Sequence, residues 1–232
     1  MNKNTVILIT DSPVLNLTLV EPYQNLSVEY SVYLNSSLLS NWFELFSGIR
    51  DEIDPIILLS EEDKEYIPRK FIPKKFTTMF YSGSKLLNFS EDLFQMKRIN
   101  DSKVMILFIN SIGLTQSYVL RVYNLIHAEE ASLVIGKSNR DKIIFCSTYG
   151  IDNELVNSLF VAKRNYNEYL GLITVKDIFI HTMGGFLSID DFEDIKKLYI
   201  ELSKKESLSY CSPNMHARFN DVFVDYKELL NV

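Results

Sequence analysis

Apolar residues follow two patterns along the chain: short uninterrupted runs, and longer stretches in which they recur every three or four positions. Alternation of these patterns is typical of an α/β fold, in which helices cover a sheet of buried strands. We therefore expect a single domain over residues 1–232, with a Rossmann-like, mostly parallel central sheet flanked by helices. The segments expected to be extended are 6–9, 55–59, 76–81, 104–109, 132–136, 142–146 and 175–181.

The run from Val104 to Ile109 consists of six consecutive apolar residues. A strand without polar positions is buried on both faces, as strands in the centre of a parallel sheet are. Thr115 follows a short polar stretch and can cap a helix that carries Val119, Val122 and Ile126 on one face. Residues 104–109 are therefore expected among the central strands.

The amphipathic stretches predict helices in several places. One helix is expected to open at Ser36 and Ser37, because the apolar residues behind them recur at helical spacing. Others are expected over 86–96 and 153–162. Between the first two helices, the charged segment 61–75 contains two prolines and is expected to be a surface excursion.

Near the C-terminus, Asp190 and Glu193 have the spacing of a capping box, which predicts a helix that begins there. Apolar residues also recur at helical spacing beyond Ser212. Residues 204–232 are therefore expected to form an extension that docks on the same domain.

The charge composition of the chain argues against nucleic acid and anionic membranes as binding partners. The chain has 24 Lys and Arg against 30 Asp and Glu, with a net charge of −6. Without a basic cluster, binding to nucleic acid or to an anionic membrane surface is not expected. No stretch is long and apolar enough to predict a membrane span. Cys146 and Cys211 are 65 positions apart and suggest no disulfide framework, so a cytoplasmic location is expected.

Four segments in order resemble the bacterial nucleotide-diphospho-sugar-transferase-like family, which has a glycosyltransferase A-type fold. Residues 80–87 resemble a glycine-containing stretch before a helix. Residues 110–115, Asn-Ser-Ile-Gly-Leu-Thr, resemble Asp-Ser-Pro-Gly-Leu-Thr. Residues 131–141 resemble a segment that contains Asp-Val-Val-Ile-Gly, and residues 188–195 resemble Asp-Val-Asp-Thr-Pro-Glu-Asp-Leu.

This resemblance implies transfer of a sugar from a nucleotide donor, assisted by Mg²⁺ or Mn²⁺. The ligand would be a nucleotide sugar, whose diphosphate a divalent cation bridges. Asp190 matches the family's later carboxylate and would be the catalytic and metal-binding residue. The matched positions for nucleotide binding would be Asp11, Ser82, Gly83, Lys85, Asn110 and Ser111.

The sequence departs from the family pattern at two places. Asn110 stands where the family has a strand-end Asp, and the loop after Ile9 contains no basic residue to neutralise a diphosphate. An inactive binding or scaffold protein on the same fold is therefore a second hypothesis, in which Asp190 only caps a helix. A nucleotidyltransferase similar to molybdenum-cofactor guanylyltransferases is a third, although the basic N-terminal loop that such enzymes need is absent.

Overall fold

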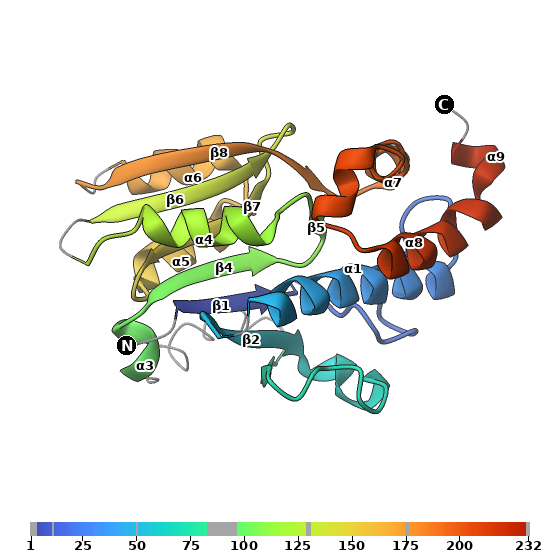
Figure 1. Ribbon diagram of the computed structural model, residues 1–232, viewed down its shortest axis with the longest axis horizontal. Coiled ribbons are helices and arrows are strands. Elements are labelled where there is room, and N and C mark those ends of the chain that lie inside the picture. The colour runs from blue at the N-terminus through green and yellow to red at the C-terminus, as the bar shows by residue number, and fades with distance from the viewer. Residues whose placement is uncertain are drawn as a thin grey trace.

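The computed structural model describes residues 4–10, 12–49, 51–82, 97–128, 131–174 and 177–230. They form an α/β domain with an eight-stranded mixed sheet flanked by helices (Figure 1). The strand order is β3-β2-β1-β4-β7-β6-β8-β5. The expected α/β class is therefore confirmed.

The sheet is only partly parallel, which corrects the expectation of a mostly parallel sheet. Strands β1 (Asn4–Ile9), β2 (Ile53–Ser60), β3 (Thr77–Tyr81) and β4 (Lys103–Phe108) all run in one direction. Strand β7 (Ile143–Tyr149) is antiparallel to both of its neighbours, β4 and β6. The reason is local: β6 and β7 are joined by a turn of a few residues, and such a turn can only connect antiparallel strands.

The remaining strands complete the sheet beyond that reversal. Strand β6 (Ser132–Ser138) pairs in parallel with β8 (Phe179–Ser188), and the short β5 (Ser111–Ile112) is antiparallel to the end of β8. Because β7 is antiparallel to both β4 and β6, β6 runs in the same direction as β4, and so does β8, which is parallel to β6. The carboxyl ends of β1, β4 and β8 therefore lie at one edge of the sheet.

Strand β4 is central, as the sequence predicts, with β1 on one side and β7 on the other. Its apolar residues are buried, and Leu107 has no exposed surface. The helix predicted behind it is α4 (Gln116–Asn124), and the Thr115 side chain accepts a hydrogen bond from the Tyr118 N–H. This prediction is confirmed.

Helices cover the two faces of the sheet and make two hydrophobic layers. Helices α1 (Val28–Gly48) and α4 pack on one face, whereas α5 (Asn153–Val161) and α6 (Tyr166–Ile173) pack on the other. Successive residues of β1 alternate between the layers: Val6 joins the α1 layer and Ile7 joins the α5 layer. Strands β2, β4, β6 and β7 contribute to both layers in the same way.

Helix α1 begins at Ser27 and not at Ser36, which corrects the prediction. The Ser27 hydroxyl accepts the Tyr30 N–H, so Ser27 is the cap. The hydroxyls of Ser36 and Ser37 each donate to the Tyr33 carbonyl at 2.8 Å, within the helix. The Ser36 hydroxyl also accepts a hydrogen bond from Arg218 of α8 (Pro213–Asp225), so it faces a neighbouring helix.

The C-terminal segment packs against α1. Helices α7 (Phe192–Leu202), α8 (Pro213–Asp225) and α9 (Lys227–Leu230) form a third apolar cluster with the first half of α1. The described residues also form the short 3-10 helices η1 (Glu61–Tyr66) and η3 (Lys205–Ser209) and the short helix α3 (Lys97–Asn100). The predicted helix over 86–96 lies outside the described residues. None of the helices in the described ranges is long and apolar enough to cross a membrane.

Candidate functional site

A cleft of about 480 Å³ opens at the carboxyl ends of β1 and β4. Its walls come from the loop after β1, Asn35 of α1, the two residues after β4, the corner between β8 and α7, and the ends of the β6–β7 turn and of α5. Open α/β sheets bind ligands outside the carboxyl ends of their strands. The polar side chains that line it include Glu21, Asn110, Lys142, Arg164, Asp190 and Asp191.

Asn110 and Asp190, which the resemblance assigns to the nucleotide site, meet in this cleft. The Asn110 Nδ2 donates to Asp190 Oδ1 at 2.8 Å. The backbone joins the same two segments, because the Ile189 N–H donates to the Asn110 carbonyl at 2.8 Å. The two positions that the resemblance assigns to one site therefore lie in direct contact.

Arg164 links the same pair and is the residue that sequence reasoning missed. Its Nη1 donates to Asn110 Oδ1 at 2.7 Å, and its Nη2 donates to Asp190 Oδ1 at 3.0 Å. The guanidinium also lies 4.4 Å from the centre of the Phe108 ring. Only 3% of Arg164 is exposed, so a permanent positive charge is buried in the wall of the cleft.

The backbone at the end of α5 directs Arg164 into this position. Lys163 and Arg164 both have positive φ angles, 48° and 62°. The Arg164 N–H donates to the Leu159 carbonyl, and its own carbonyl accepts the Ile143 N–H at 2.7 Å. A left-handed residue other than glycine costs about 1–2 kcal/mol, so the surrounding contacts must hold it. Such strain concentrates at functional sites.

Two further groups surround the Asp190 carboxylate. The Ser188 hydroxyl donates to Asp190 Oδ2 at 2.5 Å, and the Lys142 Nζ lies 3.9 Å from Oδ1. Two cations therefore face one carboxylate at this point of the wall. The excess of one positive charge favours an anionic ligand.

The cap of α7 is Asp191 and not Asp190, which corrects the predicted capping box. Asp191 accepts the Asp194 N–H at 2.9 Å, and it also pairs with Arg140 at 2.6 Å. Burial alone would raise the pKa of Asp191, but the hydrogen bonds from Arg140 and from the Asp194 N–H lower it overall. Asp190 is thereby left for the cleft.

The loop after β1 is closed around a buried carboxylate from η1. The N–H groups of Val14, Leu15 and Asn16 all donate to Asp63, at 2.7–3.1 Å. Asp63 has no exposed surface, so the expectation that the whole of 61–75 lies at the surface is wrong for this residue. Desolvation raises the pKa of Asp63, and the three backbone hydrogen bonds oppose that rise.

Two of the other sequence-predicted nucleotide residues, Ser82 and Ser111, are described by the structure, and neither lines the cleft. Ser111 is fully buried in β5, where its hydroxyl donates to the Phe108 carbonyl at 2.6 Å. Ser82 is exposed after β3 and does not line the cleft. Asp11, Gly83 and Lys85 lie outside the described residues.

The donors around Asp190 do not fit the divalent cation that the resemblance implies. Mg²⁺ and Mn²⁺ need several free oxygen ligands. Asp190 Oδ1 and Asn110 Oδ1 already accept hydrogen bonds from Arg164, and Lys142 adds a second positive charge. Over the ranges that the structure describes, no group of three or more His, Cys, Asp or Glu side chains could hold a metal.

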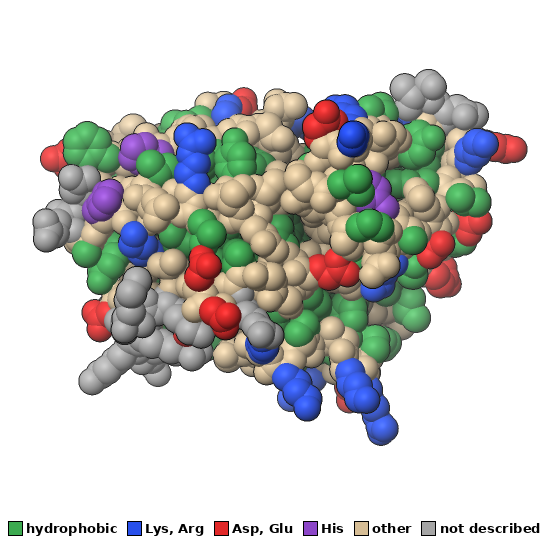
Figure 2. All heavy atoms as spheres, in the orientation of Figure 1, with side chains coloured by type: hydrophobic (Ala, Val, Ile, Leu, Met, Phe, Trp, Pro, Cys, Tyr) green, Lys and Arg blue, Asp and Glu red, His purple; other side chains and the backbone are tan. Residues whose placement is uncertain are grey.

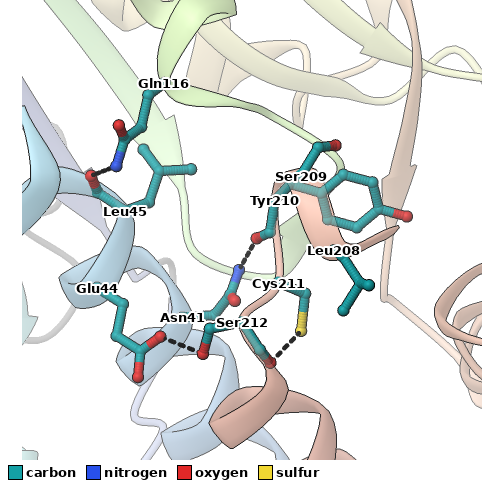
Figure 3. A pocket seen from close by; sticks show the side chains of 9 residues that line it. All are labelled: Asn41, Glu44, Leu45, Gln116, Leu208, Ser209, Tyr210, Cys211 and Ser212. Carbon is teal, nitrogen blue, oxygen red and sulfur yellow. Dashed lines mark hydrogen bonds between the residues drawn. The ribbon is translucent and has the colours of Figure 1, made fainter. Parts of the chain in front are cut away.

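A smaller pocket of about 180 Å³ lies between α1, the start of α4 and the segment before α8 (Figure 3). Its polar groups bond to one another: Asn41 donates to the Tyr210 carbonyl, and Ser212 donates to Glu44. Burial, with a smaller effect from Glu44, raises the pKa of the Cys211 thiol to about 12. A thiol that stays protonated is a poor nucleophile, so this pocket is not a site of cysteine chemistry.

On the face that carries α1 and α4, acidic and basic side chains are scattered and do not gather in one basic patch (Figure 2). Within the cleft, Lys142 and Arg164 both face Asp190, while Arg140 pairs with Asp191 and the carboxylate of Glu21 also lines the wall.

Comparison with solved structures identifies the fold. A protein from Desulfovibrio desulfuricans G20, provisionally named a nucleotide-diphospho-sugar transferase, superimposes with a TM-score of 0.68, 12% identity, and coverage of 99% of this chain and 97% of that one. The chain has the fold of nucleotide-diphospho-sugar transferases. No family model matches the sequence, and no curated protein matches it.

Two further neighbours with this transferase fold are more distant. They are the 4-diphosphocytidyl-2C-methyl-D-erythritol synthase of Anaerococcus prevotii DSM 20548 and a protein of Thermus thermophilus named mannose-1-phosphate geranyltransferase. The first has a TM-score of 0.52, with 14% identity over 88% of this chain and 97% of that one. The second has a TM-score of 0.53, with 9% identity over 88% and 80%. The resemblance inferred from the motifs is confirmed as a shared fold.

Proposed function

We propose that this protein binds a nucleotide-diphospho-sugar in the cleft at the carboxyl ends of β1 and β4, and that it transfers the sugar. The observation that supports this most is the meeting of Asn110, Lys142, Arg164 and Asp190 in one wall of that cleft. The shared fold adds support, because one neighbour is provisionally named a nucleotide-diphospho-sugar transferase and another is named a 4-diphosphocytidyl-2C-methyl-D-erythritol synthase.

The size and charge of the cleft suit such a ligand. A volume of about 480 Å³ is within the range of pockets that hold small organic ligands. In the proposal, Lys142 and Arg164 pair with the diphosphate, and their positive charge stabilises the nucleoside diphosphate as it leaves. Asp191 also lines the cleft, but Arg140 pairs with it.

Asp190 is the candidate catalytic residue. It is the carboxylate next to both cations, and 33% of its side chain is exposed. In the proposal it holds Arg164 and Lys142 in place and accepts the proton of the acceptor hydroxyl.

A second candidate function is binding without transfer. The observation that favours it is the state of the two carboxylates: Asp190 is bonded to Arg164, Asn110 and Ser188, and Asp63 takes the N–H groups of the loop after β1. A site whose polar groups bond to each other can hold a ligand and still lack a free base.

Calorimetry with uridine, guanosine, cytidine and thymidine diphosphate sugars tests binding, and release of the nucleoside diphosphate tests transfer. Binding with release supports the transferase, and binding without release supports the second candidate. Lys142→Met should weaken binding by about tenfold, because it removes one charge contact with the diphosphate. Arg218→Met, which removes a cation from α8, is the matched control and should bind as the wild type does. No binding of any of the four would refute both functions.

A further inference from the structure

We propose that the Arg164 guanidinium is the resident cation of this site, so that binding of a diphosphate needs no divalent metal. This inference rests on the proposed function and names the charge that its ligand meets. The oxygen atoms of Asn110 and Asp190 do not suit the metal that the resemblance implies, because Arg164 already binds them.

The guanidinium holds the two oxygen atoms that a metal would need. Arg164 Nη1 is 2.7 Å from Asn110 Oδ1, and Nη2 is 3.0 Å from Asp190 Oδ1. A hard cation binds its oxygen ligands at about 2.0–2.6 Å, so it would have to replace the guanidinium to reach both of them. Arg164 and a metal ion are therefore alternatives at this position.

Arg164 is held too firmly to give way to an ion. The residue is 3% exposed, and its guanidinium lies against the Phe108 ring, at 4.4 Å. Its backbone is anchored at both ends, by bonds to Leu159 and Ile143. A side chain without a solvent-exposed alternative position stays where its partners hold it.

The charge balance also favours an anion at this position. Arg164 and Lys142 carry two positive charges, and Asp190 supplies one negative charge between them. Asp190 pairs with the buried Arg164, so the charge that remains is that of the partly exposed Lys142, which a diphosphate complements. A divalent metal would instead add positive charge beside two cations. The neutral side chain of Asn110 fits the same balance, because a carboxylate there would neutralise the remaining charge.

The first experiment titrates Mn²⁺ alone and follows its electron paramagnetic resonance signal. The wild type should bind no Mn²⁺ below about 1 mM, because its oxygen donors are taken by Arg164. The double variant N110D with R164M should bind at least about tenfold more tightly than N110D alone, since only the double variant has two carboxylates without the resident cation. Micromolar binding by the wild type would overturn the proposal without any variant.

The second experiment measures uridine diphosphate binding by calorimetry in a chelator and in millimolar Mg²⁺. The wild-type Kd should agree within about twofold, and R164M should weaken binding by about tenfold or more, whereas R218M should not. Arg218 is matched because it also lies over an aromatic ring, that of Tyr33. Binding that disappears in the chelator would refute the resident cation and leave the proposed function standing. No binding of uridine diphosphate in either condition would overturn the diphosphate role of Arg164, whereas the proposed function would be refuted only if none of the four nucleotide sugars binds.

Discussion

Replacement of Asp63 by alanine should destabilise the protein by about 3–6 kcal/mol. The N–H groups of Val14, Leu15 and Asn16 would lose their buried acceptor. Each unsatisfied buried donor costs about 1–3 kcal/mol, and the lower half of that range applies here because Val14 lines the cleft, from which water can reach the loop. Such a loss is a large part of the roughly 5–15 kcal/mol that is typical of a domain.

Asparagine at position 63 should cost less, about 1–3 kcal/mol. Its carbonyl can keep the three bonds made by Oδ1, but its amide group would face the Val14 N–H, which lies 3.0 Å from the present Oδ2. The comparison of Asp63→Ala with Asp63→Asn therefore separates the loss of the acceptor from the loss of the charge.

Urea unfolding followed by fluorescence measures these changes, because Trp42 is the only tryptophan and is buried. Glu65→Ala, an exposed acidic residue of the same 3-10 helix, is the control and should change stability by less than about 0.5 kcal/mol. A loss below about 1 kcal/mol for Asp63→Ala would refute the role of Asp63 as the acceptor of the loop.

The raised pKa of Asp63 predicts the direction in which stability changes with pH. Desolvation raises this pKa in the folded protein, so the folded state takes up a proton before the unfolded state does as pH falls. Stability of the wild type relative to Asp63→Asn should therefore increase as pH falls from neutral toward 3.8. A difference that shrinks over that window would show that the backbone hydrogen bonds dominate.

Leu107→Asp should cost several kcal/mol in urea unfolding, at least about 4, because it buries an unpaired charge in the central strand; an unchanged midpoint would contradict the position of β4. Asp191→Ala should cost about 0.5–2 kcal/mol as the loss of a helix cap. Because the pKa of Asp191 is lowered in the folded protein, that difference should disappear as pH falls below 3.8, and a constant difference would contradict the cap and the Arg140 pair. Asn110→Asp should have a lower Tm than the wild type, since its new carboxylate oxygen faces Asp190. Mn²⁺ should not restore the Tm while Arg164 is present, and a restored Tm would show that the ion displaces the guanidinium.

Local sequence patterns predicted those parts of the fold in which the residue type directly reflects its structural role, such as burial or helix capping. The run 104–109 is apolar because it is buried on both faces, and Thr115 precedes a helix because its hydroxyl accepts a backbone N–H. The start of α1 was missed because Ser36 and Ser37 resemble a cap, whereas their neighbour is another helix. The direction of β7 depends on the short turn before it. An apolar run indicates a buried strand but does not indicate whether that strand is parallel or antiparallel to its neighbours.

The site was only half predictable for a similar reason. Asn110 and Asp190 were found because each follows a recognisable motif, and their contact is a consequence of the sheet order. Arg164 lies in no motif, and the sequence alone does not distinguish a buried arginine from an exposed one. In the sequence Asp63 is one of several charged residues in a row. Only the hydrogen bonds that it accepts from the loop after β1 distinguish it from its exposed neighbours.

The reversed direction of β7 has a consequence for how the cleft obtains its charge. The first residue of an antiparallel strand lies at the edge where its parallel neighbours end, so Lys142 and Ile143 are placed beside the end of β4. Ile143 in turn bonds the Arg164 carbonyl, so both cations depend on where β7 starts. The turn between β6 and β7 sets that start, and Asp141 within it has a φ of 55°. A deletion of one residue in this turn would shift Lys142 by about 3.3 Å and turn it to the other face of the sheet. The length of a surface hairpin, together with the identities of Lys142 and Arg164, therefore determines how much positive charge reaches Asp190 at this edge of the sheet.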